Sequence, residues 1–227
     1  MSYKYYLLKR KIENIIISPL IGIGKLIFLI TDNKKSYDLY FFFPFYHLGG
    51  AEKVHLQIAK LAKEKKAVIV FTRKSNNEGF LNAFKAIGID IEEASSFTNN
   101  DLFRLPINII ARGYYAARIN KDQAMVFNGQ SNFGYKIAPL VNSHLQQFEL
   151  IHSFNSFSWI RIPFANYYTK TVMISQKKIQ EHVLQYDQIN AQANLKDRII
   201  YIPNAVEPSS ITVNKPWEKP FKVIYVG

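Results

Sequence analysis

A pair of glycines after the first apolar run of the chain is the feature best suited to binding an anion. Gly49 and Gly50 lie between residues 38–46 (DLYFFFPFY) and a segment with helical periodicity. Because glycine has no side chain, its backbone amide can approach a ligand closely, and a helix N-terminus favours negative charge. We therefore predict that Gly49 and Gly50 contact a phosphate group such as a pyrophosphate. Glu52 follows in the first helical turn, where we expect it only to stabilise the helix.

A histidine at the end of a predicted strand is the best candidate for catalysis. His152 directly follows the run 148–151 (FELI). Binding sites in parallel sheets form at the carboxyl ends of strands, so we expect the imidazole of His152 to project toward a cleft. An imidazole can exchange protons and hydrogen bonds near neutral pH. His55, His144 and His182 show no partner spacing, and we expect all three at the surface.

Polar residues after two predicted strands could bind the hydroxyl groups of an acceptor molecule. One group follows residues 124–128 and the other follows His152. The candidate acceptor-binding residues are Asn128, Gln130, Ser131, Asn155 and Arg161. For the first group an ordinary Asn-Gly turn is an equally good explanation.

The spacing of glycines and acidic residues excludes several other kinds of site. Residues 22–24 (GIG) begin like a dinucleotide-binding fingerprint, but Ile27 stands where the third glycine belongs. Leu26 follows Lys25, so the serine or threonine of a P-loop is missing. The closest approach to an Asp-x-Asp motif is residues 90–92 (DIE), and no metal-ligand cluster is found. We therefore expect neither a metal ion nor a cofactor.

The candidate residues lie on segments that alternate between strand and helix. Apolar runs typical of strands buried on both faces cover residues 38–46, 66–72, 89–93, 124–128, 148–153, 171–175 and 198–202. Helical periodicity covers residues 51–61, 81–87, 100–119 (interrupted at Pro106) and 176–185. This alternation predicts an α/β fold, doubly wound, with a mostly parallel Rossmann-like sheet.

Two details of these helices can be predicted. In the first helix the apolar residues at helical spacing are expected to face the core, and they are Ala51, Val54, Ile58 and Leu61. Ser175 is the expected N-cap of the helix at 176–185.

The first 36 residues form a basic, amphipathic leader, and the whole chain carries a net charge of +12. Such a segment can lie on anionic lipid headgroups, or pack as a helix on its own domain with its lysines outward. The apolar stretch 15–30 is interrupted by Pro19 and Lys25 and is shorter than the roughly 20 residues of a membrane span. We therefore expect no transmembrane helix. Cysteine is absent, which excludes disulfides and is compatible with a reducing cytosol.

Taken together, four segments resemble the N-terminal half of family 4 retaining glycosyltransferases, which have the GT-B fold. In order and spacing they match the family's glycine turn, its strand ending in histidine, its strand and serine-led helix, and its exit segment. They are residues 47–54 (HLGGAEKV), 148–153 (FELIHS), 170–184 (KTVMISQKKIQEHVL) and 199–207 (IIYIPNAVE). Ala205 and Glu207 replace the glycine and aspartate that are usual in the family.

The resemblance implies transfer of a hexose from a nucleotide diphosphate sugar to a cell-envelope glycan or lipid-linked acceptor. The reaction would take place in a cleft between two Rossmann-like domains, with the nucleotide sugar as co-substrate. Gly49 and Gly50 would approach the donor phosphates, and His152 would lie beside the reacting sugar. The expected location is cytoplasmic, with peripheral contact at the inner membrane face as an open alternative.

The domain boundaries follow from the same resemblance and from composition. Residues 37–206 form the expected acceptor-side domain, and residues 207–220, with three prolines, read as a linker. Residues 221–227 (FKVIYVG) match the first strand of a donor-binding domain that this chain does not contain. On that basis the chain is expected to be a truncated half that does not transfer sugar on its own.

Two other functions remain open from the sequence. The chain could be a non-catalytic module that binds a glycan or a partner protein. A basic nucleic-acid-binding domain is the weaker alternative, because basic and aromatic residues do not interleave beyond the leader. We expect no nucleic-acid partner.

Overall fold

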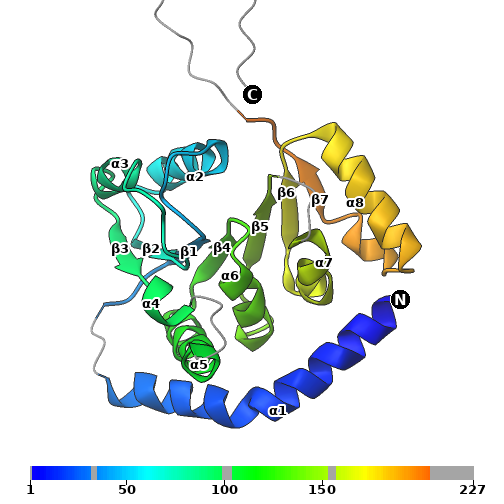
Figure 1. Ribbon diagram of the computed structural model, residues 1–227, viewed down its shortest axis with the longest axis horizontal. Helices are drawn as coiled ribbons and strands as arrows, with labels where there is room; N and C mark the ends of the chain where they lie inside the picture. The colour runs from blue at the N-terminus through cyan, green and yellow to red at the C-terminus, as the bar shows by residue number, and fades with distance from the viewer. Residues whose placement is uncertain (1, 32–34, 99–103, 153–156, 205–227) are drawn as a thin grey trace, which may run out of the picture.

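The computed structural model describes residues 2–31, 35–98, 104–152 and 157–204. Seven strands in this part of the chain form one sheet with the order β3-β2-β1-β4-β5-β6-β7, and every neighbouring pair is parallel (Figure 1). The strands are β1 (Leu39–Phe43), β2 (Ala67–Phe71), β3 (Asp90–Glu93), β4 (Met125–Asn128), β5 (Gln147–Ile151), β6 (Lys170–Met173) and β7 (Ile199–Tyr201). The predicted α/β fold with a parallel Rossmann-like sheet is confirmed.

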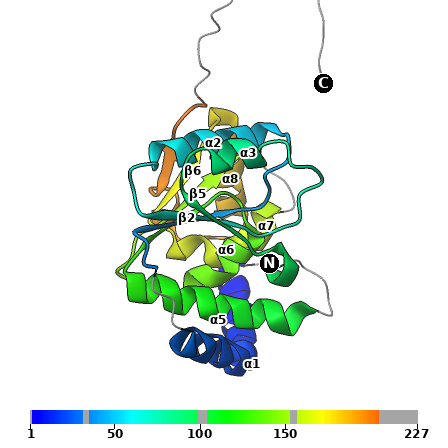
Figure 2. The ribbon, with the colours of Figure 1, turned by 90° about the vertical axis from the view of Figure 1, so that its left-hand side faces the viewer.

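Helices cover the two faces of the sheet unequally. Figure 2 shows α2 (Gly50–Leu61) and α3 (Leu81–Lys85) on one side, with α5 (Leu105–Asp122) and α6 (Asn132–Ile137) on the other. The long helix α1 (Tyr3–Ile30) lies outside α5 as an additional layer. The remaining helices are α4 (Ser95–Thr98), η2 (Ala138–Leu140), α7 (Phe157–Arg161), η3 (Ile162–Tyr167), α8 (Gln176–Gln188) and η4 (Ala193–Leu195).

The central strand β1 shows how the core is divided between the two faces. Side chains alternate along a strand, so Tyr40 and Phe42 join the cluster under α5, whereas Phe41 and Phe43 join the cluster under α2. All four aromatic side chains are buried. A strand covered on both sides needs apolar residues at every position, which explains the unbroken apolar run.

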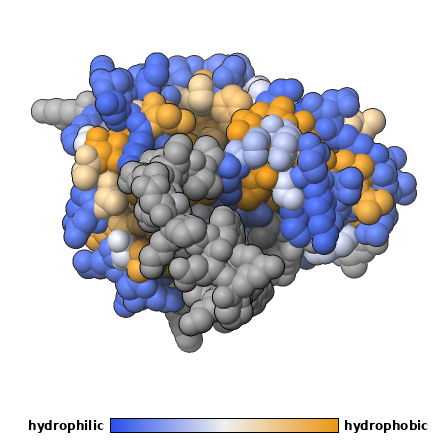
Figure 3. Space-filling model, turned by 90° about the horizontal axis from the view of Figure 1, so that it is seen from above, coloured by the Kyte–Doolittle hydropathy of each residue, from blue (hydrophilic) through white to orange (hydrophobic). Residues whose placement is uncertain are grey.

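The buried face of α2 differs from the predicted one. Glu52, His55, Leu56 and Ala59 point inward, while Leu61 is 87% exposed. The apolar face that periodicity identified instead lines a groove of about 520 Å³ between α2 and the sheet. Viewed from this side, hydrophobic residues gather around a hollow (Figure 3). The groove is lined on α2 by Val54, Ile58 and Leu61, and on the sheet by Phe127, Leu150 and Val172.

Two prolines also have roles that differ from the prediction. Pro19 lies inside α1 without ending it, so the leader is one helix of 28 residues. By length and composition alone, α1 is long and apolar enough to cross a membrane. Pro106 stands in the first turn of α5, where a proline costs no hydrogen bond, and does not interrupt a helix.

Other predictions concern the C-terminal third of the chain. Ser175 occupies the N-cap position of α8, but its side chain makes no capping hydrogen bond. The expected linker at 207–220 and the strand at 221–227 lie outside the described residues.

Candidate functional site

A pair of histidines lies at the carboxyl ends of the central strands. His152 directly follows β5 and is partly buried. Its backbone N–H donates a hydrogen bond to Oε1 of Gln130 (3.0 Å), and its Nε2 lies 3.1 Å from Nε2 of His55. Gln130 follows β4 with a left-handed backbone (φ 61°), which is uncommon for a residue other than glycine. Gln130, which follows β4, thus holds the backbone of His152, and His55 of α2 contacts its imidazole.

His55 is buried, so the prediction that it lies at the surface is wrong. Its ring stacks on Phe43 with centroids 4.3 Å apart. A Cβ atom at Gly129 would clash with Nε2 of His55 and lie 2.8 Å from the Phe43 ring. Because Gly129 has no side chain, the ring of His55 can pack next to the end of β4. The signal for His55 was its spacing from Glu52, Leu56 and Ala59, which together form the inward face of α2.

Both histidines are neutral at physiological pH. Burial lowers the pKa of His152 to about 4. Burial, and to a smaller extent the proximity of His152, lowers the pKa of His55 well below its ordinary value. Neutral imidazoles can form a hydrogen bond between their Nε2 atoms only if one nitrogen is protonated and the other is not.

The tautomers follow from the other ring nitrogens. Nδ1 of His55 is buried and has no hydrogen-bond partner among the described residues. A buried N–H without an acceptor is costly, so we assign the proton of His55 to Nε2, which donates to His152. His152 then carries its own proton on Nδ1. That nitrogen makes no hydrogen bond to a described residue, so it can serve a ligand.

The two glycines of the predicted phosphate site differ in the room around them. Gly49 is the N-cap of α2, and a Cβ there would collide with the carboxylate of Glu52. At Gly50 an added Cβ would meet no heavy atom within 4 Å. Glu52 is buried and lies 3.5 Å from Nε2 of His47. Of the two glycines, Gly50 is exposed and Gly49 is partly buried, so Gly50 is the more accessible to a ligand.

Asn128 and Ser131 are occupied by internal hydrogen bonds, contrary to their predicted role. Nδ2 of Asn128 donates to the Tyr168 hydroxyl (2.9 Å), and its Oδ1 accepts from the backbone N–H of Ser131 (2.8 Å). Oγ of Ser131 pairs with the hydroxyl of Thr72 (2.7 Å) and caps α6. Both residues are fully buried, so they shape the turn that carries Gln130 and do not face a ligand.

Arg161 is also part of the interior. Its guanidinium pairs with the carboxylate of Glu149, and both side chains are almost completely buried. The hydroxyl of Thr171 donates a further hydrogen bond of 2.6 Å to the same carboxylate. An arginine enclosed in this way cannot reach an acceptor, so the predicted role of Arg161 is corrected. Asn155 lies outside the described residues.

Of the other two histidines predicted at the surface, one is exposed and one is buried. His144 is exposed, as expected, and pairs with Gln123 (2.7 Å). His182 is buried, contrary to expectation, and its Nδ1 lies 2.8 Å from the Lys178 carbonyl oxygen. Within the described ranges, no group of three or more histidine, cysteine, aspartate or glutamate side chains could hold a metal ion.

The comparisons with known proteins support the fold. No protein-family model matches the sequence, and no curated protein matches it. Among solved structures, the chain is similar to HepE from Anabaena, crystallised in complex with UDP and glucose, with a TM-score of 0.53 and 13% identity. The similarity covers 75% of this chain and 45% of HepE, so the chain spans less than half of that protein's length. The likeness shows that the chain shares an α/β fold with part of HepE.

Proposed function

We propose that this chain is the acceptor-side half of a nucleotide-sugar-dependent glycosyltransferase. The reaction would transfer a hexose from a nucleoside diphosphate sugar to a glycan or lipid-linked acceptor of the cell envelope. Retention of configuration is part of the proposal and rests on the family resemblance. The observation that carries it is the position of His152: a neutral, partly buried imidazole at the carboxyl end of β5, held by Gln130 and His55.

In this proposal His152 acts through a hydrogen bond and not through a charge. Because Nε2 accepts from His55, the Nδ1–H of His152 is the group that meets the substrate. It would donate to a hydroxyl of the transferred sugar and fix its orientation at the reacting carbon. A hydrogen bond that strengthens as charge develops on the sugar stabilises the transition state.

The N-terminus of α2 has the complementary role toward the donor phosphates. Gly50 is exposed at the first residue of α2, where the helix dipole would favour the negative charge of a phosphate. Glu52 would have to turn away from Gly49 for both amides to take part. The fold likeness to HepE, whose crystal structure contains UDP and glucose, agrees with a nucleotide-sugar donor.

Release of nucleoside diphosphate tests the proposal. The polypeptide of the complete reading frame would be incubated with UDP-, GDP- and dTDP-hexoses, with and without a lipid extract of the source cells as acceptor. Release that depends on both one donor and the extract is the expected result. If calorimetry shows glycan binding while no donor is turned over, the chain is a binding module and not part of a transferase.

A further inference from the structure

The outward face of α1 is a continuous apolar stripe. At roughly 100° per residue, steps of three and four keep side chains on one side of a helix. The exposed large apolar residues of α1 follow these steps and are Tyr5, Leu8, Ile12, Ile15, Ile16, Ile23, Leu26, Leu29 and Ile30. Ile16 is 71% exposed and Ile30 is 73% exposed. Exposed apolar patches of this kind mark interaction surfaces.

The opposite face of α1 is fixed to the domain along its whole length. Near its N-terminus, Tyr3 is buried and its backbone N–H donates to the carbonyl of Ile189 (2.7 Å). In the middle, the guanidinium of Arg10 lies 4.5 Å from the Phe164 ring centroid. Toward its C-terminus, Cβ atoms at Gly24 or at Gly113 of α5 would clash with the backbone of the other helix. The two backbones therefore touch, and α1 is an integral part of the domain.

Positive charges flank the stripe on both sides. Lys4, Lys9, Lys11 and Lys25 are all exposed. The acidic side chain of α1 is Glu13, which pairs with Arg10 at 2.7 Å. Lysines along the rim of an apolar helix face are typical of helices that lie on anionic lipid.

Exposed aromatic residues of neighbouring elements lie beside α1. Trp159 of α7 is 40% exposed, and its ring stacks on Tyr6 of α1 at 6.5 Å. Tyr167 of η3 is partly exposed beside the first half of α1. Tryptophan and tyrosine are enriched where apolar lipid meets the headgroups, because their rings have an apolar body and a polar edge.

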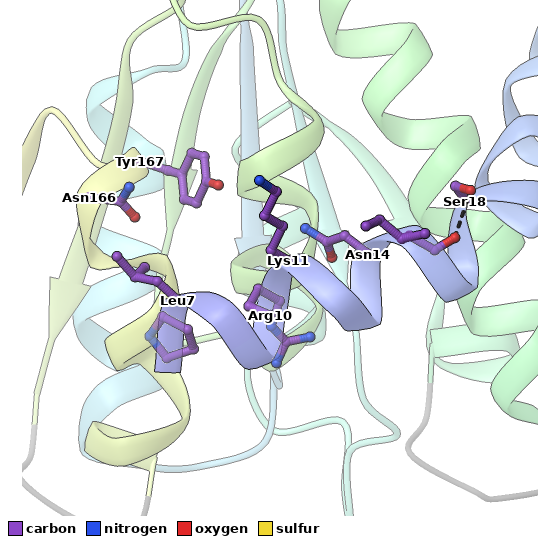
Figure 4. A pocket seen from close by; sticks show the side chains of 9 residues that line it. Leu7, Arg10, Lys11, Asn14, Ser18, Asn166 and Tyr167 are labelled. Atoms are coloured by element: carbon purple, nitrogen blue, oxygen red, sulfur yellow. Dashed lines mark hydrogen bonds between the residues drawn. The ribbon is translucent and has the colours of Figure 1, made fainter. Parts of the chain in front are cut away.

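A pocket with both polar and apolar lining residues opens along one rim of the stripe. It has a volume of about 500 Å³ and lies between α1 and η3 (Figure 4). Lys11 and Asn14 line it on α1, and Asn166 and Tyr167 line it on η3. A cation and several hydrogen-bond donors beside an apolar stripe form a suitable site for a phosphate headgroup whose chains follow the stripe.

We infer that α1 binds flat on the surface of an anionic phospholipid bilayer, with Trp159 at the headgroup level and the sheet above it. A second copy of the chain is the less suitable occupant, because a symmetric contact would bring the lysines of both copies together. A transmembrane orientation would require α1 to leave α5, η3 and α8, and would bury Glu13 and Lys25 in lipid. This membrane contact does not depend on sugar transfer.

Vesicle binding with a fluorescent reporter tests the inference. Trp217→Phe leaves Trp159 as the sole tryptophan of the chain. Its emission should shift to the blue with vesicles of phosphatidylcholine mixed with phosphatidylglycerol, and not with phosphatidylcholine alone. Lipids brominated near the headgroup should quench it more than lipids brominated at the chain ends.

Paired variants separate the apolar contribution from the charge. Ile15→Glu with Ile16→Glu should lower the vesicle affinity about 100-fold, since two buried aliphatic side chains are lost. Lys9→Gln with Lys11→Gln should lower it about 20-fold, and only on anionic vesicles. Leu184→Glu on α8, which is equally exposed, is the matched control and should have no effect. Thermal unfolding followed by circular dichroism confirms that each variant is folded.

Three results would overturn the inference. The first is equal binding to neutral and anionic vesicles. The second is a dimer in light scattering that the Ile15 and Ile16 replacements convert to a monomer, without vesicle binding by either form. The third is resistance of bound protein to extraction at alkaline pH, which indicates a span.

Discussion

Strand β5 carries two polar clusters only three residues apart, and they serve different purposes. Glu149, inside the strand, is enclosed with Arg161 and Thr171. His152, just beyond its end, is held by Gln130 and His55 but remains partly exposed. In the first cluster the two opposite charges pair with each other in the interior, although Nη1 of Arg161 has no described partner. In the second cluster both rings are neutral and that of His152 is partly exposed. A closed network stabilises the fold, and an open one can bind a ligand.

This difference depends on the position along the strand and not on residue type. Within the strand, neighbours β4 and β6 and the helices on both faces enclose a side chain. Beyond the last ladder pair, between Ile151 and Met173, a residue has no such cover. The same comparison explains why Asn128, the last residue of β4, is internal while Gln130, two residues later, reaches the site.

The largest expected effect on stability concerns the buried cluster of Glu149, Arg161 and Thr171. Arg161→Met removes the partner of a fully buried carboxylate and should lower the free energy of unfolding by about 3–5 kcal/mol. Lys178→Ala removes a partly exposed pair with Glu181 and should cost at most about 1 kcal/mol. Denaturant unfolding measures both. A loss below about 1 kcal/mol for Arg161→Met would mean that the cluster is open to water.

Gly129→Ala should have an intermediate effect, because it brings a methyl group against His55 and Phe43. We expect a loss of about 1–3 kcal/mol in the free energy of unfolding, and displacement of the His55 ring from His152. Gly50→Ala places a methyl group in open space and should change stability by less than about 1 kcal/mol. If the two variants are equally stable, the histidine ring does not occupy the place assigned to it.

The smallest effect concerns acid stability. Since the pKa of His152 is lowered to about 4 from an ordinary value of 6.5, the folded protein keeps this ring neutral while the unfolded chain takes up a proton. The stability that the neutral His152 ring contributes to the folded protein is complete above pH 6.5 and is lost as the pH falls toward 4. His152→Asn should therefore reduce the drop in melting temperature between neutral and mildly acidic pH. His182, also with a pKa near 4, is retained in both proteins, so its contribution cancels. Parallel curves for the two proteins would show that His152 titrates normally.

Much of the fold could be predicted from the sequence, because strands buried on both faces leave a strong local signal. The run at Leu39–Phe43 and the glycine at 88, with φ of 84°, are examples in which one segment determines its own structure. The position of His152 followed from the end of its strand. These features depend on local pattern alone.

Partners distant in sequence could not be predicted in this way. His55 and His152 are 97 positions apart, and Glu149 and Arg161 meet only because α7 packs beside β5. For α2, periodicity found an apolar face, but it could not distinguish a core from an open groove. Periodicity therefore places His55 at the surface, although it faces inward beside Glu52. A polar residue can be buried when a partner forms a hydrogen bond with it. The sequence alone does not show which residue that partner is.

Turnover by two histidine variants tests the central claim most directly. Nucleoside diphosphate release would be measured for His152→Ala and His144→Ala in the polypeptide of the complete reading frame, with melting temperatures as the folding control. His152→Ala should lose about 10²–10³-fold in kcat, because a hydrogen bond at the reacting centre is removed. It should also lose about 1–3 kcal/mol in the free energy of unfolding, because the buried Nε2–H of His55 loses its acceptor. His144→Ala, altered at an exposed site bonded only to Gln123 among the described residues, should retain full activity. Equal activity of the two variants would contradict the assignment of His152 to the reacting centre.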